Sequence, residues 1–311
     1  LQYTGGSIAP GVALRPISLA AGGVGEIQMV FNSGSRSGNY IHIDGSRLTG
    51  SGGLTVDTMG GTATSRFIVL GSAAYTGPTV VADNSELQTN WVVATGGVQT
   101  PFGAGTNGLG SPVTLGANSI LTFYSYNSPA TIAIGSLSGT SASAVLHGES
   151  GGTHTVRIGG DNSTAAFSGA IQDDGGALGI VKVGSGTQTF SGALSYTGPT
   201  TVEGGTLILS GTSTGAGLVT VNNGTLQLAG PAGGPPDHGT TVKGDLTINA
   251  GGTARLNQHA QIKETSVVTI NGGLLDFNGW IDGIGRLDMT GGTYANTGSG
   301  FLLLNTNTNA L

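Results

Sequence analysis

The sequence predicts an all-β protein, a parallel β-solenoid (β-helix) that forms a single elongated domain. Three observations support this prediction. The composition is unusual, a short strand–corner–strand unit recurs along the second half of the chain, and successive units are separated by similar intervals. Repetition of this kind is typical of stacked coils, in which each unit buries its apolar face against its neighbours.

The composition disfavours helices. Only 8% of the 311 residues are charged, against roughly 25% in an average soluble protein, and 60 residues are Gly. Gly costs about 1 kcal/mol relative to Ala in a helix interior, and Thr, Ser and Asn are weak helix formers. Gly and Asn do tolerate the positive φ angles of tight turns. We therefore expect many short strands joined by tight corners.

Charge and hydropathy exclude two classes of partner. The formal net charge is −6, and the ten Lys and Arg residues are scattered singly. A nucleic-acid-binding surface needs clustered cations. No apolar run approaches the ~20 residues of a membrane helix. We therefore expect no nucleic-acid partner and no membrane insertion. The chain has no Cys, so disulfides do not stabilise the fold.

The repeated unit is an alternating strand, an Asn/Gly corner and a second alternating strand. The segment 219–228 shows it well, with Asn222, Asn223 and Gly224 at the corner. Matching first strands begin at Val219, Leu246, Val268 and Leu287, which are 27, 22 and 19 residues apart. An alternative is a series of antiparallel hairpins, because Asn-Gly between alternating strands is also a strong hairpin signal. The regular spacing favours coils.

Two segments rich in Gly and Pro interrupt the pattern, at residues 99–112 and 231–240. Pro cannot donate to a strand ladder, so we expect both segments to be lateral loops. We also expect residues 1–40 to be an N-terminal region that caps the solenoid or contacts another subunit. Residues 41–311 then form the solenoid.

Three phrases occur in order and close together: Lys182-Val183-Gly184-Ser185-Gly186-Thr187, Tyr196-Thr197-Gly198-Pro199-Thr200, and Gly204-Gly205-Thr206-Leu207. With them, this part of the chain resembles the autotransporter-associated β-strand repeat family. A degenerate copy, Tyr75-Thr76-Gly77-Pro78-Thr79, lies upstream. The resemblance implies a right-handed parallel β-helix of the passenger type.

The same resemblance implies an extracellular or bacterial cell-surface protein. Passengers of that family usually precede a translocating barrel, whereas this chain ends at Asn309-Ala310-Leu311. We expect either a passenger that has been cut free or export by another route. The start at Leu1 is expected to be a processed or trimmed end.

The acidic residues offer weak catalytic candidates. Polysaccharide lyases and hydrolases need carboxylates in mutual reach, or a Ca²⁺ site beside a base. Asp173-Asp174 is the only adjacent acidic pair, and a solvated turn explains it better. Asp276, Asp282 and Asp288 are evenly spaced and could converge, but exposed strand or turn carboxylates are the favoured interpretation.

Other candidate residues are equally weak. No metal-ligand spacing occurs among the histidines, which are His42, His147, His154, His238 and His259. Four aromatic residues could stack on sugars or pack in the core: Trp91, Tyr124, Tyr126 and Trp280. Asn162 and Asn223 begin formal glycosylation sequons, which chance explains in a chain so rich in Asn and Thr. We therefore expect no catalytic residue, no cofactor, no metal site and no enzymatic activity.

The ends of the solenoid carry the favoured functional prediction. The last coils remain apolar at Phe301-Leu302-Leu303-Leu304, and no charged residue follows Asp288. Uncapped ends can add head to tail and give a filament, so we expect other copies of this chain as partners. The alternative is an adhesin whose lateral loops bind surface glycans. A polysaccharide-degrading enzyme ranks third.

Overall fold

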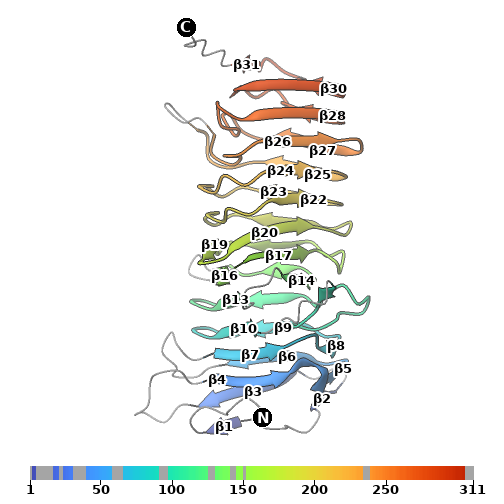
Figure 1. Cartoon of the computed structure of the whole chain (residues 1–311), viewed down its shortest axis with the longest axis vertical. Helices are drawn as coiled ribbons and strands as arrows, with labels where there is room; N and C mark the ends of the chain where they lie inside the picture. Colours follow the sequence, from blue (N-terminus) through green and yellow to red (C-terminus); the bar gives the residue numbers. More distant parts are fainter. Residues whose placement is uncertain are drawn as a thin grey trace.

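The structure, a computed structural model, describes residues 2–4, 17–20, 24–30, 40–57, 66–90, 97–124, 130–140, 145–149, 152–233 and 239–304. The chain is an elongated stack of coils, with β1 (Gln2–Thr4) at one end and β31 (Leu302–Leu304) at the other (Figure 1). Apart from one 3₁₀ turn, η1 (Gly45–Arg47), the regular elements of the described residues are all β-strands.

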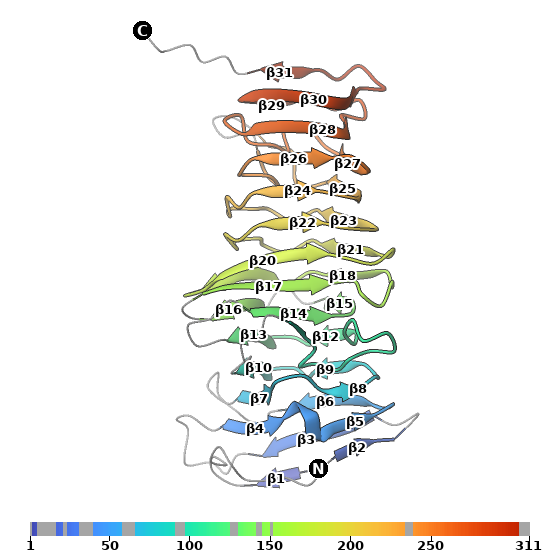
Figure 2. The ribbon, with the colours of Figure 1, turned by 45° about the vertical axis from the view of Figure 1, so that its right-hand side comes forward.

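Every strand pairing between described residues is parallel. Parallel neighbours need a long connection, whereas a hairpin pairs its strands antiparallel. The parallel solenoid predicted from the sequence is therefore confirmed, and the hairpin alternative is wrong. Figure 2 shows strands of successive coils lying one above another along the stack.

The first face of the solenoid begins as a six-stranded ladder. Its strands are β1, β3 (Val24–Val30), β6 (Gly53–Asp57), β9 (Thr79–Val81), β12 (Val113–Leu115) and β15 (Leu137–Ser138). A bridge between Gly139 and Phe167 carries the face onward. The later strands are β18 (Ala165–Phe167), β21 (Thr187–Phe190), β23 (Thr206–Leu209), β25 (Gly224–Leu228) and β27 (Gly252–Leu256).

The second face contains the strands that begin each predicted repeat. They are β11 (Val98–Gln99), β14 (Ala130–Ile134), β17 (Thr153–Ile158), β20 (Ala177–Lys182), β22 (Thr200–Val202), β24 (Val219–Val221) and β26 (Leu246–Asn249). The ten-residue β28 (Val267–Asp276) then pairs with both β26 and β27, which joins the first two faces. The equally long β30 (Arg286–Ala295) pairs with β28.

The third face is regular only in the first half of the chain. Its strands are β4 (Tyr40–Asp44), β7 (Arg66–Leu70), β10 (Glu86–Asn90), β13 (Ile120–Tyr124), β16 (Val145–Glu149) and β19 (Ala170–Asp174). Beyond β19, single bridges connect Ile171 to Leu194 and Leu194 to Ser213. Two short ladders complete the described strands: β2 (Ile17–Leu19), β5 (Leu48–Gly50) and β8 (Ala74–Tyr75), and β29 (Asp282–Ile284) with β31.

The register agrees with the repeat found in the sequence. Val219 is the ladder partner of Leu246, Leu246 of Val268, and Val268 of Leu287. Intervals of 27, 22 and 19 residues therefore each correspond to one coil. The longest interval contains the predicted loop at 231–240, of which residues 234–238 lie outside the described part.

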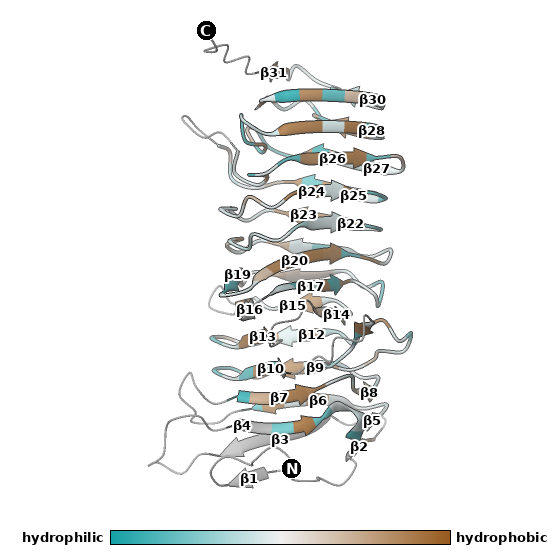
Figure 3. Ribbon diagram, in the orientation of Figure 1, coloured by the Kyte–Doolittle hydropathy of each residue, from teal (hydrophilic) through white to brown (hydrophobic). Residues whose placement is uncertain are grey.

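Alternation along each strand builds the core. Val219 and Val221 are buried on β24, and Thr220 between them is half-buried. The same alternation gives apolar and polar residues in turn along β28 and β30 (Figure 3). One inward column runs through Val202, Val221, Ile248 and Ile270, each fully buried. The hydrophobic effect of this continuous core holds strands together that are too short to be stable alone.

The segment at 99–112 contains no strand after Gln99, but it does not simply project from the side. Phe102 is buried, and its ring lies 6.0 Å from that of Phe123 in the core. The sequence interpretation missed this return of the loop to the core. At the N-terminal end, β3 pairs in register with β6, so the ladder of the first face extends into the segment 1–40.

Candidate functional site: the uncovered end of the stack

The inward column of the core reaches the surface at the last described coil. Ile270 is fully buried, and its ladder partner in the next coil is Met289 on β30. Met289 occupies a core position, yet 47% of its surface is exposed. The cause is positional, because no described strand lies beyond β30 on this side. A residue chosen for a core therefore faces outward.

Apolar side chains gather around Met289 at this end. The described residues include seven exposed large hydrophobics, namely Val98, Leu109, Leu218, Met289, Phe301, Leu303 and Leu304. Four of the seven belong to the last coil. We define the end surface as Met289, Phe301, Leu303 and Leu304. Contiguous exposed apolar surface on a soluble protein typically marks an interaction site.

The backbone at the end surface is also open to a partner. β30 pairs with β28 along one edge, and β31 pairs with β29 along one edge. The opposite edges, over ten and three residues respectively, meet no other described strand. Such edges present backbone N–H and C=O groups in the pattern that another strand would bind.

A polar seam beside the core ends at the same coil. Side chains of Asn222, Asn249, Asn271 and Thr290 are hydrogen-bonded in sequence from coil to coil. The Asn249 amide donates to Asn222 Oδ1 at 2.7 Å. Each amide both donates and accepts, so the seam can extend by one coil at a time. Its last member, Thr290, is exposed.

Electrostatics at the end surface are close to neutral. Arg286 and Asp288 on β30 form an ion pair of 2.8 Å with both side chains largely exposed to solvent. An exposed pair of this kind contributes little to stability. It does cancel the charges of β30, so charge repulsion would not oppose the approach of a second copy.

The acidic residues predicted as catalytic candidates do not converge. Asp173 accepts hydrogen bonds from Leu178 N at 2.8 Å and from Thr197 N and Oγ1, while Asp174 is exposed. Asp276 accepts from Asn278 N at 2.8 Å and lies 3.5 Å from Arg255. Each of these carboxylates fastens a local turn.

Asp282 corrects one expectation. The sequence analysis favoured an exposed carboxylate, but Asp282 is only 1% exposed. Its Oδ2 accepts from Gln261 N at 2.8 Å and from Ile262 N at 3.0 Å, and its Oδ1 accepts from Gly283 N at 2.8 Å. Backbone amides that would otherwise be unpaired at the coil edge make this burial possible.

The histidines are separated along the rod. Burial lowers the pKa of the half-buried His42, and His154 is fully buried. His259 Nδ1 accepts from Ile281 N at 3.1 Å, and its ring packs edge-on against Trp280. The His147 side chain and all of His238 lie outside the described part. The described residues contain no group of three His, Cys, Asp or Glu placed to hold a metal ion.

Few of the remaining candidates are free surface groups. Trp280 is half-buried and packs against the core, and Tyr124 is half-buried on β13. Trp91 and Tyr126 lie outside the described residues. Asn162 and Asn223 are both exposed, and their Oδ1 atoms accept backbone N–H groups of Ser185 and Gly224, respectively.

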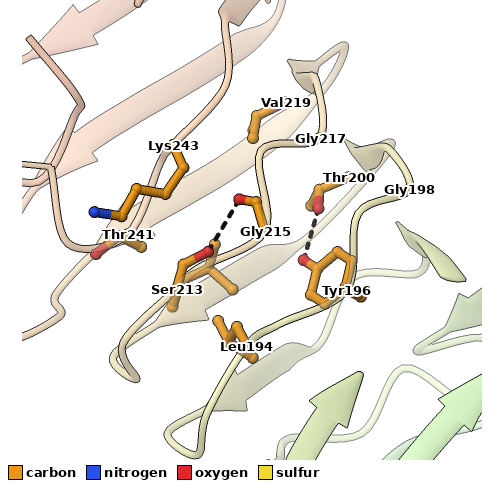
Figure 4. Close-up of a pocket in the computed structure, with 11 residues that line it drawn as sticks. Leu194, Tyr196, Gly198, Thr200, Ser213, Gly215, Gly217, Val219, Thr241 and Lys243 are labelled. Carbon is orange, nitrogen blue, oxygen red and sulfur yellow. Dashed lines mark hydrogen bonds between the residues drawn. The ribbon is translucent and has the colours of Figure 1, made fainter. Parts of the chain in front are cut away.

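One small pocket opens between coils in the second half of the chain. It is lined by residues that include Tyr196, Thr200, Ser213, Gly215 and Thr241, and Lys243 lies at its rim (Figure 4). Its volume is about 20 Å³, which is enough for about one water molecule. A sugar ring does not fit. Among the described residues, no helix is long and apolar enough to cross a membrane.

Sequence reasoning missed several buried polar residues. Lys182, Gln188 and Gln261 are each at most 1% exposed. Lys182 is the ladder partner of Val202 and lies in the inward column, but its Nζ donates to the carbonyl of Val183 at 2.6 Å. Position in the alternation would have signalled burial, because each of these residues stands where a neighbouring coil has an apolar residue.

The comparisons with known proteins agree with the repeat geometry. The profile of the passenger-associated-transport-repeat family matches the chain twice, over residues 180–208 and 204–228. These residues are passenger-associated-transport repeats. The resemblance to the autotransporter-associated repeat is thereby confirmed over this segment, which runs from β20 to β25. Comparisons with curated proteins and with solved structures gave no match.

The passenger-associated-transport repeats therefore map onto a known structural unit. Each match is slightly longer than one coil, because Thr200 pairs with Val219 and Thr206 with Thr225, 19 residues apart in both cases. The family implies an autotransporter passenger-type β-helix, and with it a secreted or cell-surface protein.

Proposed function

We propose that this chain is an extracellular structural protein, a β-solenoid subunit of a bacterial surface fibre or filament whose copies join end to end. The single observation that carries the proposal is the exposure of Met289 at a core position. A second copy that places its first coil against β30 would bury this column and pair the open strand edge. The proposal includes no enzymatic activity, no cofactor and no nucleic-acid partner.

Head-to-tail contacts suit a rod of this kind. The contact is heterologous, because the two ends of a solenoid differ, and a heterologous contact without rotation to closure gives an open filament. The parallel ladder would continue through the junction with the same spacing of about 4.8 Å between strands. Burying apolar area contributes about 25 cal/mol per Å², so the apolar end surface supplies the driving force.

Electron microscopy and sedimentation of the full chain over a range of concentrations test this proposal. We expect polymers whose length grows with concentration. Leu303→Lys should raise the concentration at which polymers form by at least about tenfold, which corresponds to 1.4 kcal/mol. Leu218→Lys is the matched control, since Leu218 is 48% exposed and Leu303 50%, but Leu218 lies on the side of the rod. Isolated short rods at every concentration would refute the filament.

A second candidate function is that of an adhesin or carbohydrate-binding passenger. The observation in its favour is Leu109, which is 51% exposed on the lateral segment 99–112. Asn107 Oδ1 accepts from Leu109 N at 3.0 Å, so the exposed side chain is held in place. Leu109→Asp should then reduce binding to surface glycans without changing polymerisation. Unchanged glycan binding would remove this segment from the proposal.

A further inference from the structure

The Tyr-Thr-Gly-Pro-Thr phrase builds the same buried hydroxyl pair in both of its copies. Tyr75 OH lies 2.5 Å from Thr79 Oγ1, and Tyr196 OH lies 2.7 Å from Thr200 Oγ1. All four side chains are at most 7% exposed. Burial raises the pKa of Tyr196 to about 12 and that of Tyr75 still further, so both phenols remain protonated.

Each pair therefore has two hydroxyl protons and shares one hydrogen bond. One proton is used within the pair, and the other needs an acceptor. In the first copy Thr79 Oγ1 donates to the carbonyl of Phe102 at 2.8 Å. The first relay thus runs from Tyr75 through Thr79 to Phe102, and both protons are satisfied.

The second copy has a different neighbour. The next coil passes this point as residues 213–217, which are small, in place of the Phe102 segment. Ser213 Oγ donates to the Gly215 carbonyl at 3.3 Å (Figure 4). Among the described residues, no protein acceptor receives the second proton of the Tyr196–Thr200 pair. An unsatisfied buried donor of this kind is costly.

The small pocket adjoins this pair and is lined by two further hydroxyls. Thr241 Oγ1 donates to Gln261 Oε1 at 2.6 Å, and Ser213 Oγ donates as described above. Each hydroxyl has one proton, so both retain the capacity to accept. The pocket volume of about 20 Å³ exceeds the ~10–15 Å³ that one water molecule requires, and a buried water typically has about three partners.

We propose that this pocket is a binding site for one ordered water molecule. The water accepts the second proton of the Tyr196–Thr200 pair and donates to Ser213 and Thr241. It thereby performs the role that the Phe102 carbonyl performs in the first copy, and it connects three successive coils. The volume decides between the possible occupants, because an aromatic side chain such as that of Phe102 does not fit.

The direct test is a high-resolution crystal structure of the full chain. We expect an ordered water within hydrogen-bond distance of Tyr196 OH or Thr200 Oγ1 and of the hydroxyls of Ser213 or Thr241. An empty pocket, or a protein carbonyl that accepts the second proton, would overturn the proposal.

A pair of matched double variants gives an independent test. Tyr75→Phe with Thr79→Val leaves the Phe102 carbonyl buried without its donor. Tyr196→Phe with Thr200→Val removes both donors and only releases the water. Hydrogen exchange of the two coils should show that the first double variant raises the opening constant about 5- to 150-fold more than the second. Equal effects in both copies would contradict the water site, and circular dichroism of each variant checks that it is folded.

Discussion

The side-chain amide of Gln188 pairs with the backbone of Leu137, a residue 51 positions earlier in the chain. Gln188 Oε1 accepts from Leu137 N at 3.0 Å, and Gln188 Nε2 donates to Leu137 O at 2.8 Å. Gln261 pairs with Gly230 N and O in the same way. Each amide takes the place of a peptide group where a short strand leaves backbone groups without a ladder partner.

Gln188→Leu is predicted to destabilise the coils around β15. The substitution roughly preserves volume but leaves the buried N–H and C=O of Leu137 unsatisfied, and each such group costs about 1–3 kcal/mol. The expected loss is therefore about 2–5 kcal/mol, measured by urea unfolding or by hydrogen exchange at Leu137. Gln172→Leu is the control, because Gln172 is half-buried on the third face. A loss below about 1 kcal/mol would contradict the peptide-like role of Gln188.

Gly215→Ala is predicted to disrupt the stack at the coil that follows the Tyr196 motif. A Cβ at Gly215 would overlap the backbone carbonyl oxygen of Tyr196, so the coils would have to separate. Overpacking costs about 1–3 kcal/mol, and more when backbone must move. Gly97→Ala is the matched control, since its Cβ would have a nearest neighbour at 3.8 Å. Thermal unfolding should show a clear decrease for Gly215→Ala alone, and equal melting temperatures would refute the close contact.

Sequence patterns predicted the fold because stacked coils repeat their local requirements. Alternation and an Asn/Gly corner recur in each coil, so Val219, Leu246 and Val268 could be aligned before any coordinates were known. Buried polar residues could not be predicted this way. Gln188 is buried because β15 is short, and that depends on a residue in another coil. The exposure of Met289 is likewise set by its place at the end of the stack and not by its local sequence.

Asp282→Leu is predicted to destabilise the last coils. Its carboxylate accepts from the backbone N–H groups of Gln261, Ile262 and Gly283, and the substitution would leave these groups without their acceptor. Charge-assisted hydrogen bonds contribute about 1.5–3 kcal/mol each, so we expect a loss of at least about 3 kcal/mol by urea unfolding. The exposed Asp174→Leu should change the free energy of unfolding by less than about 0.5 kcal/mol. Similar values for the two variants would contradict the role of Asp282.

Lys182 predicts a specific pH dependence of stability. Its Nζ donates to the carbonyls of Val183, Gly184 and Gly204 at 2.6, 3.2 and 3.3 Å. Burial lowers the pKa of this amine below its ordinary value of 10.5, and the charge of Asp161 opposes the shift. The folded pKa then lies below the unfolded one, so the unfolded chain binds more protons between the two values. In that window the stability contributed by Lys182 rises with pH.

The comparison of wild type with Lys182→Met isolates this effect, because the other titrating groups are shared. The difference in free energy of unfolding, wild type minus variant, should be constant at neutral pH. It should increase as the pH rises through the folded pKa and level off above about pH 10.5. Urea unfolding between about pH 7 and 11 measures it, with Lys263→Met as the control for loss of one lysine. A difference that stays flat or decreases with pH would show that the folded pKa of Lys182 is not lowered.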